Sequence, residues 1–210
     1  MDGLLIDSEK IYFLSARACS ADYHYGLTDE LILSTMGLNL TATYQRFSDV
    51  LGIDFPMEDF LKHERVYHKK FLDDLGLQKK KGVDELFAYL DQNGIKKAIA
   101  TSTYKKRAEM FLQMANIPGP IDHMTCGDEL KESKPEPEIY LKAASAFPFD
   151  KDEILAFEDS PNGILSAYNA GLKVVHIPDL AYVSEEIKEK SFIVLDDLSQ
   201  AIKLIEDLNS

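Results

Sequence analysis

The sequence is poor in cysteine and contains no long apolar run. Its two cysteines, Cys19 and Cys126, are far apart and have no Cys or His neighbour at metal-binding spacing. This excludes a disulfide framework and the usual kind of zinc site, and it favours a reducing, cytoplasmic location. The sequence has no stretch of about 18 apolar residues and no charged-then-apolar leader. It therefore predicts neither a membrane span nor a secretory signal.

Positive charge is also scarce. The 23 Lys and Arg residues are outnumbered by 36 Asp and Glu residues, which gives a formal net charge of -13 over 210 residues. A field of this sign repels phosphate backbones and anionic headgroups, so we expect no nucleic-acid or membrane partner. A small anion can still bind in a local pocket of opposite sign. The 45% hydrophobic and 10% aromatic content indicates a folded chain with a real core.

Residues 10–76 have a helical pattern. Apolar residues such as Ile11, Leu14 and Ala18 recur every three or four positions, and no convincing strand interrupts them. Thr28 and Pro56 are each followed by acidic residues, which is typical of helix starts. We predict an all-helical block of about four helices.

After residue 82, helices alternate with short apolar strands. Gly94 and Gly171 each fall between a helix and a strand, where a left-handed helix stop is expected. Helices are predicted over 83–93, 105–115, 137–146, 162–170 and 198–208, and strands over 97–101, 124–126, 154–157, 173–177 and 192–195. This alternation favours an α/β fold with a parallel sheet, helices on both faces and ligands beyond the carboxyl ends of the strands. Residues 1–9 and 77–210 would form this domain, with 10–76 inserted into it.

Four short segments place polar residues at expected strand ends or helix starts. Each has a plain alternative: Thr101 and Ser102 can cap a helix, Lys134 can be an exposed loop lysine, and Asp159 or Ser160 can cap the next helix. The adjacent acids Glu158 and Asp159 are a stronger indication of a functional site. Two acids after a buried strand repel each other and lose hydration, unless a cation or hydrogen-bond donors offset this free-energy cost. The segments are Asp2-Gly3, Thr101-Ser102, Ser133-Lys134-Pro135 and Glu158-Asp159-Ser160.

Taken in order, these segments resemble the motifs of the haloacid dehalogenase-type phosphatases over essentially the whole chain. In that family an apolar strand runs into Asp-x-Asp-Gly, and here Met1 takes the x position and Asp2 that of the second aspartate. The first aspartate, which attacks phosphorus, would stand one place before Met1, on a strand that the sequence also lacks. The resemblance therefore implies that the chain as written is inactive, although its family forms an aspartyl-phosphate intermediate.

The resemblance implies a Rossmann-like core and assigns roles to individual residues. Asp2 would protonate the leaving oxygen, Thr101 would bind a phosphoryl oxygen, and Lys134 would offset the negative charge. Mg²⁺ would be held by the missing aspartate, by the backbone carbonyl of Asp2 and by the carboxylate of Asp159, and Glu158 would either support the metal site or orient Lys134. The phosphate and substrate contacts would come from Gly3, Thr101, Ser102 and Lys134, and from Gly37 and Asn39 in the cap, as residues 10–76 are called in that family. The alternative for residues 36–39 is a simple turn between two helices, held by Gly37.

The implied substrate is a small phosphorylated metabolite, most readily a sugar phosphate, and the chain is expected to be a monomer. Caps of this kind close over such substrates and exclude water. The β-phosphoglucomutase subgroup typically has a histidine and an arginine near the places of Tyr12 and Leu40, so these two residues favour a hydrolase over a mutase. Dehalogenation fits less well, because Asp2-Gly3 is the phosphatase form of the loop. A mutase and a non-catalytic relative that binds a phosphometabolite remain the alternatives.

Overall fold

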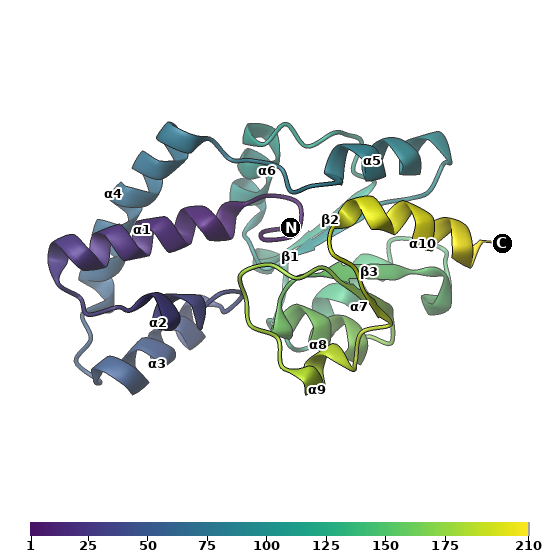
Figure 1. Cartoon of the computed structure of the whole chain (residues 1–210). Coiled ribbons are helices and arrows are strands. Elements are labelled where there is room, and N and C mark those ends of the chain that lie inside the picture. The colour runs from purple at the N-terminus through teal and green to yellow at the C-terminus, as the bar shows by residue number, and fades with distance from the viewer. Residues whose placement is uncertain (210) are drawn as a thin grey trace.

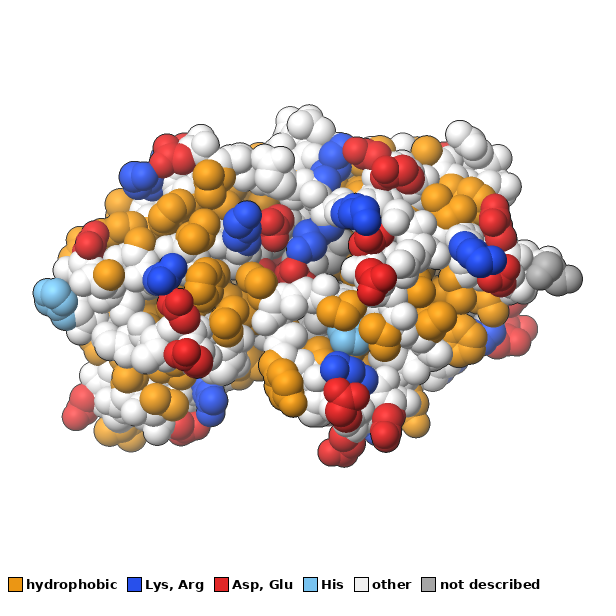
Figure 2. All heavy atoms as spheres, in the orientation of Figure 1, with side chains coloured by type: hydrophobic (Ala, Val, Ile, Leu, Met, Phe, Trp, Pro, Cys, Tyr) orange, Lys and Arg blue, Asp and Glu red, His pale blue; other side chains and the backbone are white. Residues whose placement is uncertain are grey.

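The computed structural model describes residues 1–209, and it places a helical lobe beside an α/β lobe. Figure 1 shows α1 to α4 on one side, and all strands with the later helices on the other. The N-terminal residue lies between the two lobes, next to β1 and β2. Figure 2 shows acidic and basic side chains interspersed over the face in view. Among the described residues, no helix combines the length and the apolar character needed to cross a membrane.

The helical lobe packs around its own aromatic core. Its helices are α1 (Ser8–Tyr23), α2 (Asp29–Leu33), α3 (Leu40–Leu51) and α4 (Met57–Leu75). Thr28 caps α2 by accepting the Leu31 amide at 3.2 Å, and Pro56 directly precedes α4, as the sequence predicts for both helix starts. The rings of Phe47, Phe55 and Phe60 meet with centroids 5.2 to 5.8 Å apart.

The strands of the α/β lobe are all parallel, which confirms the predicted fold class. One sheet consists of β1 (Ala98–Thr101) and β2 (His123–Cys126), and the other of β3 (Leu155–Glu158), β4 (Lys173–His176) and β5 (Ile193–Val194). The sequence predicts one sheet, whereas the described residues form two. The reason is that β1 and β3 each pair on one side only, and an apolar cavity lies between their other edges.

Helices cover both faces of the strands. On one face α5 (Val83–Gln92), α6 (Lys105–Met114) and α10 (Ala201–Leu208) contribute to the large core cluster, together with Met1, Leu4 and Leu5. On the other face α7 (Glu138–Ala144) and α8 (Pro161–Asn169) form a second cluster with β3 and β4. A short helix, α9 (Glu185–Lys188), escaped prediction, and β5 is shorter than predicted.

Candidate active site

The first turn of the chain places Asp2 against the end of β1. One Asp2 oxygen accepts the Ser8 hydroxyl at 2.8 Å. The other accepts the Thr103 hydroxyl at 2.8 Å and the Thr101 hydroxyl at 3.4 Å. The carboxylate therefore lies where the first turn, the start of α1 and the end of β1 meet.

Gly3 must be a glycine because two carboxylates crowd its Cα. Its φ of 69° is in the left-handed region, and a Cβ there would overlap the Asp159 carboxylate. The same Cβ would lie 3.0 Å from Oδ2 of Asp179, in the segment after β4. Oxygens from two strand ends thus face the same point beside the first turn, as expected for an open parallel sheet.

Lys134 lies beneath the strand ends as half of a buried ion pair. Its Nζ is 2.5 Å from Oε1 of Glu158, and the two side chains are only 12% and 5% exposed. The same Oε1 accepts the Tyr140 hydroxyl at 2.5 Å, and Lys134 lies over the Tyr140 ring at 5.0 Å. Burial alone would raise the pKa of Glu158, but Lys134, the Met1 ammonium and the Tyr140 hydroxyl lower it below its usual value. Glu158 is therefore favoured in its charged form and is held in place by Lys134 and Tyr140.

Asp159 has the opposite electrostatic environment. Burial, the charge of the adjacent Glu158 and the charges of Glu9 and Asp179 raise the pKa of Asp159 well above its usual value, although the Met1 ammonium lowers it. Repulsion of this kind is relieved by a proton or by a metal cation.

Asp179 adds a second buried carboxylate to this corner. Its Oδ1 accepts Lys80 Nζ at 2.5 Å, whereas its buried Oδ2 has no hydrogen-bond partner among the described residues. Lys80 also lies 3.5 Å from Asp7, and its amide donates to the Leu5 carbonyl at 2.9 Å. Lys80 therefore ties the segment after β4 to the first loop of the chain.

Glu9, in the first turn of α1, joins the acidic corner from the helical lobe. Burial, followed by the charges of Asp2 and Asp179, raises the pKa of Glu9 to about 7. A hydrogen bond from the Gly37 amide lowers this pKa and so acts in the opposite direction. A carboxyl group with such a pKa changes its charge near neutral pH.

The loop between α2 and α3 reaches the α/β lobe at two points. Gly37, at φ 71°, lies so close to Ser160 that a Cβ would approach the Ser160 Cβ to 2.7 Å. Asn39 Nδ2 donates to the Ser133 hydroxyl at 3.1 Å, and its Oδ1 caps α3. The loop therefore lies over the segments that hold Lys134 and Asp159.

The predicted metal ligands are brought together only in part. The Asp2 carboxylate accepts three hydroxyls, and Glu158 is bound by Lys134 and Tyr140, while Asp159 faces Gly3 and Asp179. Within residues 1–209, no group of three or more His, Cys, Asp or Glu side chains is arranged to hold a metal ion by itself. The unpartnered Asp179 oxygen and the repelled Asp159 carboxyl nevertheless fit a hard cation that takes further ligands from water or phosphate.

The structure confirms some of the non-functional explanations for these residues, namely helix capping or an exposed loop position, and contradicts others. Thr101 caps no helix, since α6 begins after Tyr104, and Lys134 is not an exposed loop lysine. Ser160 does cap α8 by accepting the Gly163 amide, and Ser102 is exposed with no contact to the Asp2 carboxylate.

Sequence reasoning missed several residues of the site. Thr103 follows Thr101 by two places and carries a second hydroxyl, and this spacing could have revealed it. The others come from elements whose approach is set by tertiary packing, and they carry no local signal: Lys80, Tyr140 and Asp179.

Comparison with known proteins gives matches over nearly the whole chain. A family model described as haloacid dehalogenase-like hydrolase matches residues 1–177. The phosphorylated carbohydrates phosphatase of Thermotoga maritima is 31% identical over 176 residues, which cover 84% of this chain and 81% of that protein. (DL)-glycerol-3-phosphatase 2 of Arabidopsis thaliana is 33% identical over 189 residues, covering 85% and 77%. The crystal structure of β-phosphoglucomutase from Clostridium difficile superimposes with a TM-score of 0.76 at 18% identity, covering 98% and 92%, which is a likeness of fold.

Proposed function

Because the chain belongs to the haloacid dehalogenase-like hydrolases, we propose that it builds the site of a Mg²⁺-dependent phosphatase for small phosphorylated metabolites. The observation that carries the proposal is the convergence of four sequence motifs. Asp2 touches Thr101, Gly3 faces Asp159, and Lys134 binds the adjacent Glu158. The relative that acts on phosphorylated carbohydrates supports a sugar phosphate as the substrate.

Each of these residues has a role that its position supports. Thr101 places its hydroxyl at the strand end, where it can donate to a phosphoryl oxygen in place of Asp2. Lys134 supplies a buried positive charge that Glu158 and Tyr140 hold in position. In this proposal Asp2 gives a proton to the leaving oxygen and takes one from the attacking water.

Mg²⁺ would be held beside Gly3 by Asp159 and the Asp2 carbonyl, with Glu158 supporting the site through Lys134. When bound, Mg²⁺ offsets the negative charge of the phosphate and the surrounding carboxylates. The Met1 ammonium already lowers the pKa values of Glu158 and Asp159. A residue joined to Met1 would replace this cation with a neutral amide. The carboxylates would then lose a nearby positive charge, and a metal ion would stabilise them more.

The attacking group in this proposal is an aspartate placed directly before Met1. The Asp2 carboxylate is unsuited to attack phosphorus, because hydroxyls bind both of its oxygens and it is needed as the acid and base. Attack by the added aspartate would form an aspartyl-phosphate and release the alcohol. Water would then hydrolyse the aspartyl-phosphate to aspartate and inorganic phosphate. A polypeptide made of residues 1–210 alone, without this aspartate, is expected not to turn over phosphate esters.

The proposal is tested by extending the chain. An apolar strand ending in Asp would be joined before Met1, and a matched form would end in Asn. We expect hydrolysis of an aryl phosphate only by the Asp form with Mg²⁺, with loss of activity on adding a chelator or on Asp159→Ala. A 210-residue chain whose activity depends on Asp159 would refute the assignment of the nucleophile. An inert Asp form would favour the non-catalytic relative.

A mutase is the second candidate, and Tyr12 weighs against it. Burial raises the pKa of Tyr12 to about 12, and its hydroxyl lies 3.4 Å from the Thr35 hydroxyl. Such a group is a poor proton carrier near neutral pH. Leu40, the second departure from the mutase pattern, is 58% exposed at the start of α3. The extended chain should therefore release inorganic phosphate from a sugar monophosphate, and isomerisation without phosphate release would reverse this choice.

A further inference from the structure

The loop after β4 carries a buried carboxylate, that of Asp179, whose two oxygens have different surroundings. The side chain is 8% exposed, and its Oδ1 accepts Lys80 Nζ at 2.5 Å. Its Oδ2 is buried and has no hydrogen-bond partner among the described residues. A buried carboxylate oxygen without a donor is destabilising, so a cation or a hydrogen-bond donor beside this oxygen would be favourable.

This second oxygen faces the same point as the carboxylate of Asp159. A Cβ added to Gly3 would overlap Asp159 Oδ2 and would lie 3.0 Å from Asp179 Oδ2. The charge of Asp179 is also among the influences that raise the pKa of Asp159, as expected for neighbouring carboxylates. An oxygen that belongs to none of the four sequence motifs therefore lies beside the point where a cation is proposed.

Lys80 joins Asp179 to the two connections between the lobes, residues 3–7 and 76–82. Its Nζ lies 3.5 Å from Asp7 Oδ1, and its amide donates to the Leu5 carbonyl at 2.9 Å. Burial alone would lower the pKa of Lys80, but Asp179 and Asp7 raise it above its usual value. One charged ammonium thus holds three segments that are distant in sequence.

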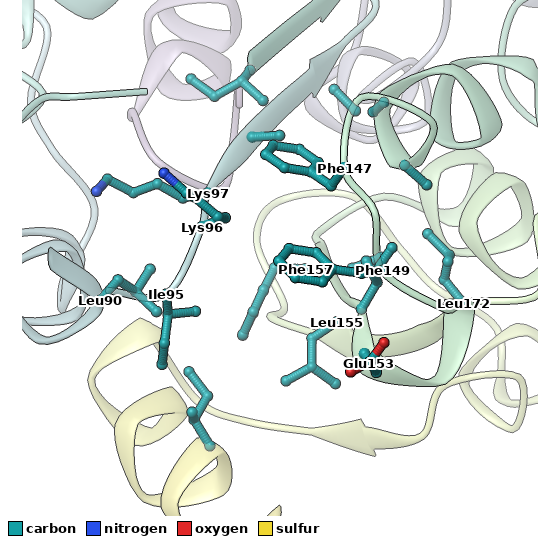
Figure 3. A pocket seen from close by; sticks show the side chains of 18 of the residues that line it. Leu90, Ile95, Lys96, Lys97, Phe147, Phe149, Glu153, Leu155, Phe157 and Leu172 are labelled. Carbon is teal, nitrogen blue, oxygen red and sulfur yellow. The ribbon is translucent and has the colours of Figure 1, made fainter. Parts of the chain in front are cut away.

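The first connection is anchored on its apolar side. The Leu5 side chain is buried in the large core cluster and lines the cavity between the two sheets. Figure 3 shows Leu155 and Phe157 among the apolar side chains around this cavity. The carbonyl that accepts the Lys80 amide therefore belongs to a residue held by packing, which fixes where Lys80 leaves the backbone.

The loop after β4 also touches both lobes. Ala181, two residues after Asp179, packs against the aromatic core of the helical lobe. Val183 is buried in the cluster that β3 and β4 form with α7 and α8. A displacement of Asp179 would therefore be transmitted to the helical lobe through Lys80 and through this loop.

We propose that Asp179 is a positioning residue for the cation beside Gly3, and that Lys80 couples this carboxylate to the two connections between the lobes. Asp179 Oδ2 would stabilise the cation and the water around it, while Oδ1 stays with Lys80. Binding of the cation would then stiffen the connections, and the order of the connections would in turn affect cation binding. The inference rests on the proposed function only for the presence of a cation at this point.

The first test measures the affinity for Mn²⁺, an oxygen-seeking paramagnetic cation, by electron paramagnetic resonance. It uses the 210-residue chain and the form extended by a strand that ends in Asp. Asp179→Asn should weaken Mn²⁺ binding about tenfold or more, as is usual for groups that support metal ligands. Asp7→Asn is the matched control, because it removes an equal charge from the other partner of Lys80, and it should cost less than about threefold. Equal losses in the two variants would overturn the role of Asp179.

The second test follows amide hydrogen exchange with and without Mg²⁺. In the unchanged protein, Mg²⁺ should slow exchange in residues 76–82 and 177–183. In Lys80→Met it should slow exchange only in 177–183, and Lys80→Arg, which keeps the cation, should restore the effect on 76–82. Lys81→Met is the control, because Lys81 pairs with Asp197 at 2.7 Å and is 78% exposed. Equal protection of 76–82 in Lys80→Met, or its loss in Lys81→Met, would overturn the coupling.

Activity separates this inference from the proposed function. If the extended form hydrolyses an aryl phosphate and needs the same Mg²⁺ concentration after Asp179→Asn, the phosphatase proposal stands and the positioning role fails. If Mn²⁺ binding depends on Asp179 as expected but the extended form is inert, the positioning role stands and the phosphatase proposal fails. If neither form binds Mn²⁺, the positioning role fails, because it requires a cation beside Gly3.

Discussion

Replacing Lys134 by methionine should destabilise the protein far more than removing an exposed lysine. The Lys134 and Glu158 side chains are 12% and 5% exposed, with their charged atoms 2.5 Å apart. Methionine keeps most of the apolar stem but leaves the Glu158 charge buried. Breaking a buried pair in this way costs about 3–5 kcal/mol. Because Tyr140 still donates to Glu158, we expect a loss near the lower end, about 3 kcal/mol.

The assay is urea unfolding at pH 7, with Lys69→Met as the matched control. Lys69 pairs with Asp73 at 2.6 Å, but the two side chains are 75% and 58% exposed, so this loss should stay below about 0.5 kcal/mol. The double variant Lys134→Met with Glu158→Gln should be more stable than Lys134→Met alone, since it removes the uncompensated charge. An unchanged slope of the unfolding free energy with urea would show that the denatured state is comparable.

The pH dependence tests the cause. In the wild type, Lys134 helps to hold the pKa of Glu158 below its unfolded value of 4.5, so the pair's stabilisation is present above that pH and is lost on acidification. In Lys134→Met, burial prevails and raises the pKa, so stability falls as pH rises. The gap between the two proteins should therefore widen from pH 4 to pH 7. A gap below 1 kcal/mol that does not change with pH would refute the reasoning.

Three further predictions concern the acidic corner and the loop that covers it. Burial and nearby charges raise the pKa of Glu9 from 4.5 to about 7, so its contribution to stability is full below pH 4.5 and is lost through pH 7. Relative to Glu9→Gln, the wild type should therefore lose at most about 3 kcal/mol between pH 4.5 and 8 in urea unfolding, and parallel profiles would contradict this. Asp179→Asn should lower the pKa of Glu9 in an NMR titration, because it removes a nearby negative charge; an unchanged pKa would count against that coupling. Gly37→Ala should increase proteolysis of the loop more than Gly94→Ala, since both glycines have positive φ but only Gly37 is crowded, by Ser160; equal rates would mean that the contact is unimportant.

The sequence was sufficient where the signal is local. Thr28 and Pro56 mark helix starts because their caps depend on neighbouring residues, and the structure has α2 and α4 beginning there. Gly94 and Gly171 adopt the left-handed conformation that ends the preceding helices. The alternation of helices and strands likewise predicts the parallel α/β fold, because it follows from short stretches of chain.

The sequence was insufficient where distant segments meet. Tyr140 lies on α7 and donates to Glu158 on β3, and no spacing rule links residues from these two elements. The same holds for Lys80 and Asp179, which are joined across 99 positions. The division into two sheets also escaped prediction, because strand neighbours depend on pairing partners rather than on the residues of a strand itself.

The helical lobe and the chemistry of the corner cannot be independent, because α1 begins inside the site. Ser8 binds Asp2 at one end of the first turn of α1, and the next residue, Glu9, accepts the Gly37 amide from the covering loop. Asp7 donates its amide to Gln78 at 2.9 Å, which ties together the two connections between the lobes. A rotation of the helical lobe would move Ser8 and Glu9 relative to Asp2. Moving the loop would change the burial that raises the pKa of Glu9 and would remove the hydrogen bond from Gly37 that lowers it, so loop position and the charge of this corner are coupled.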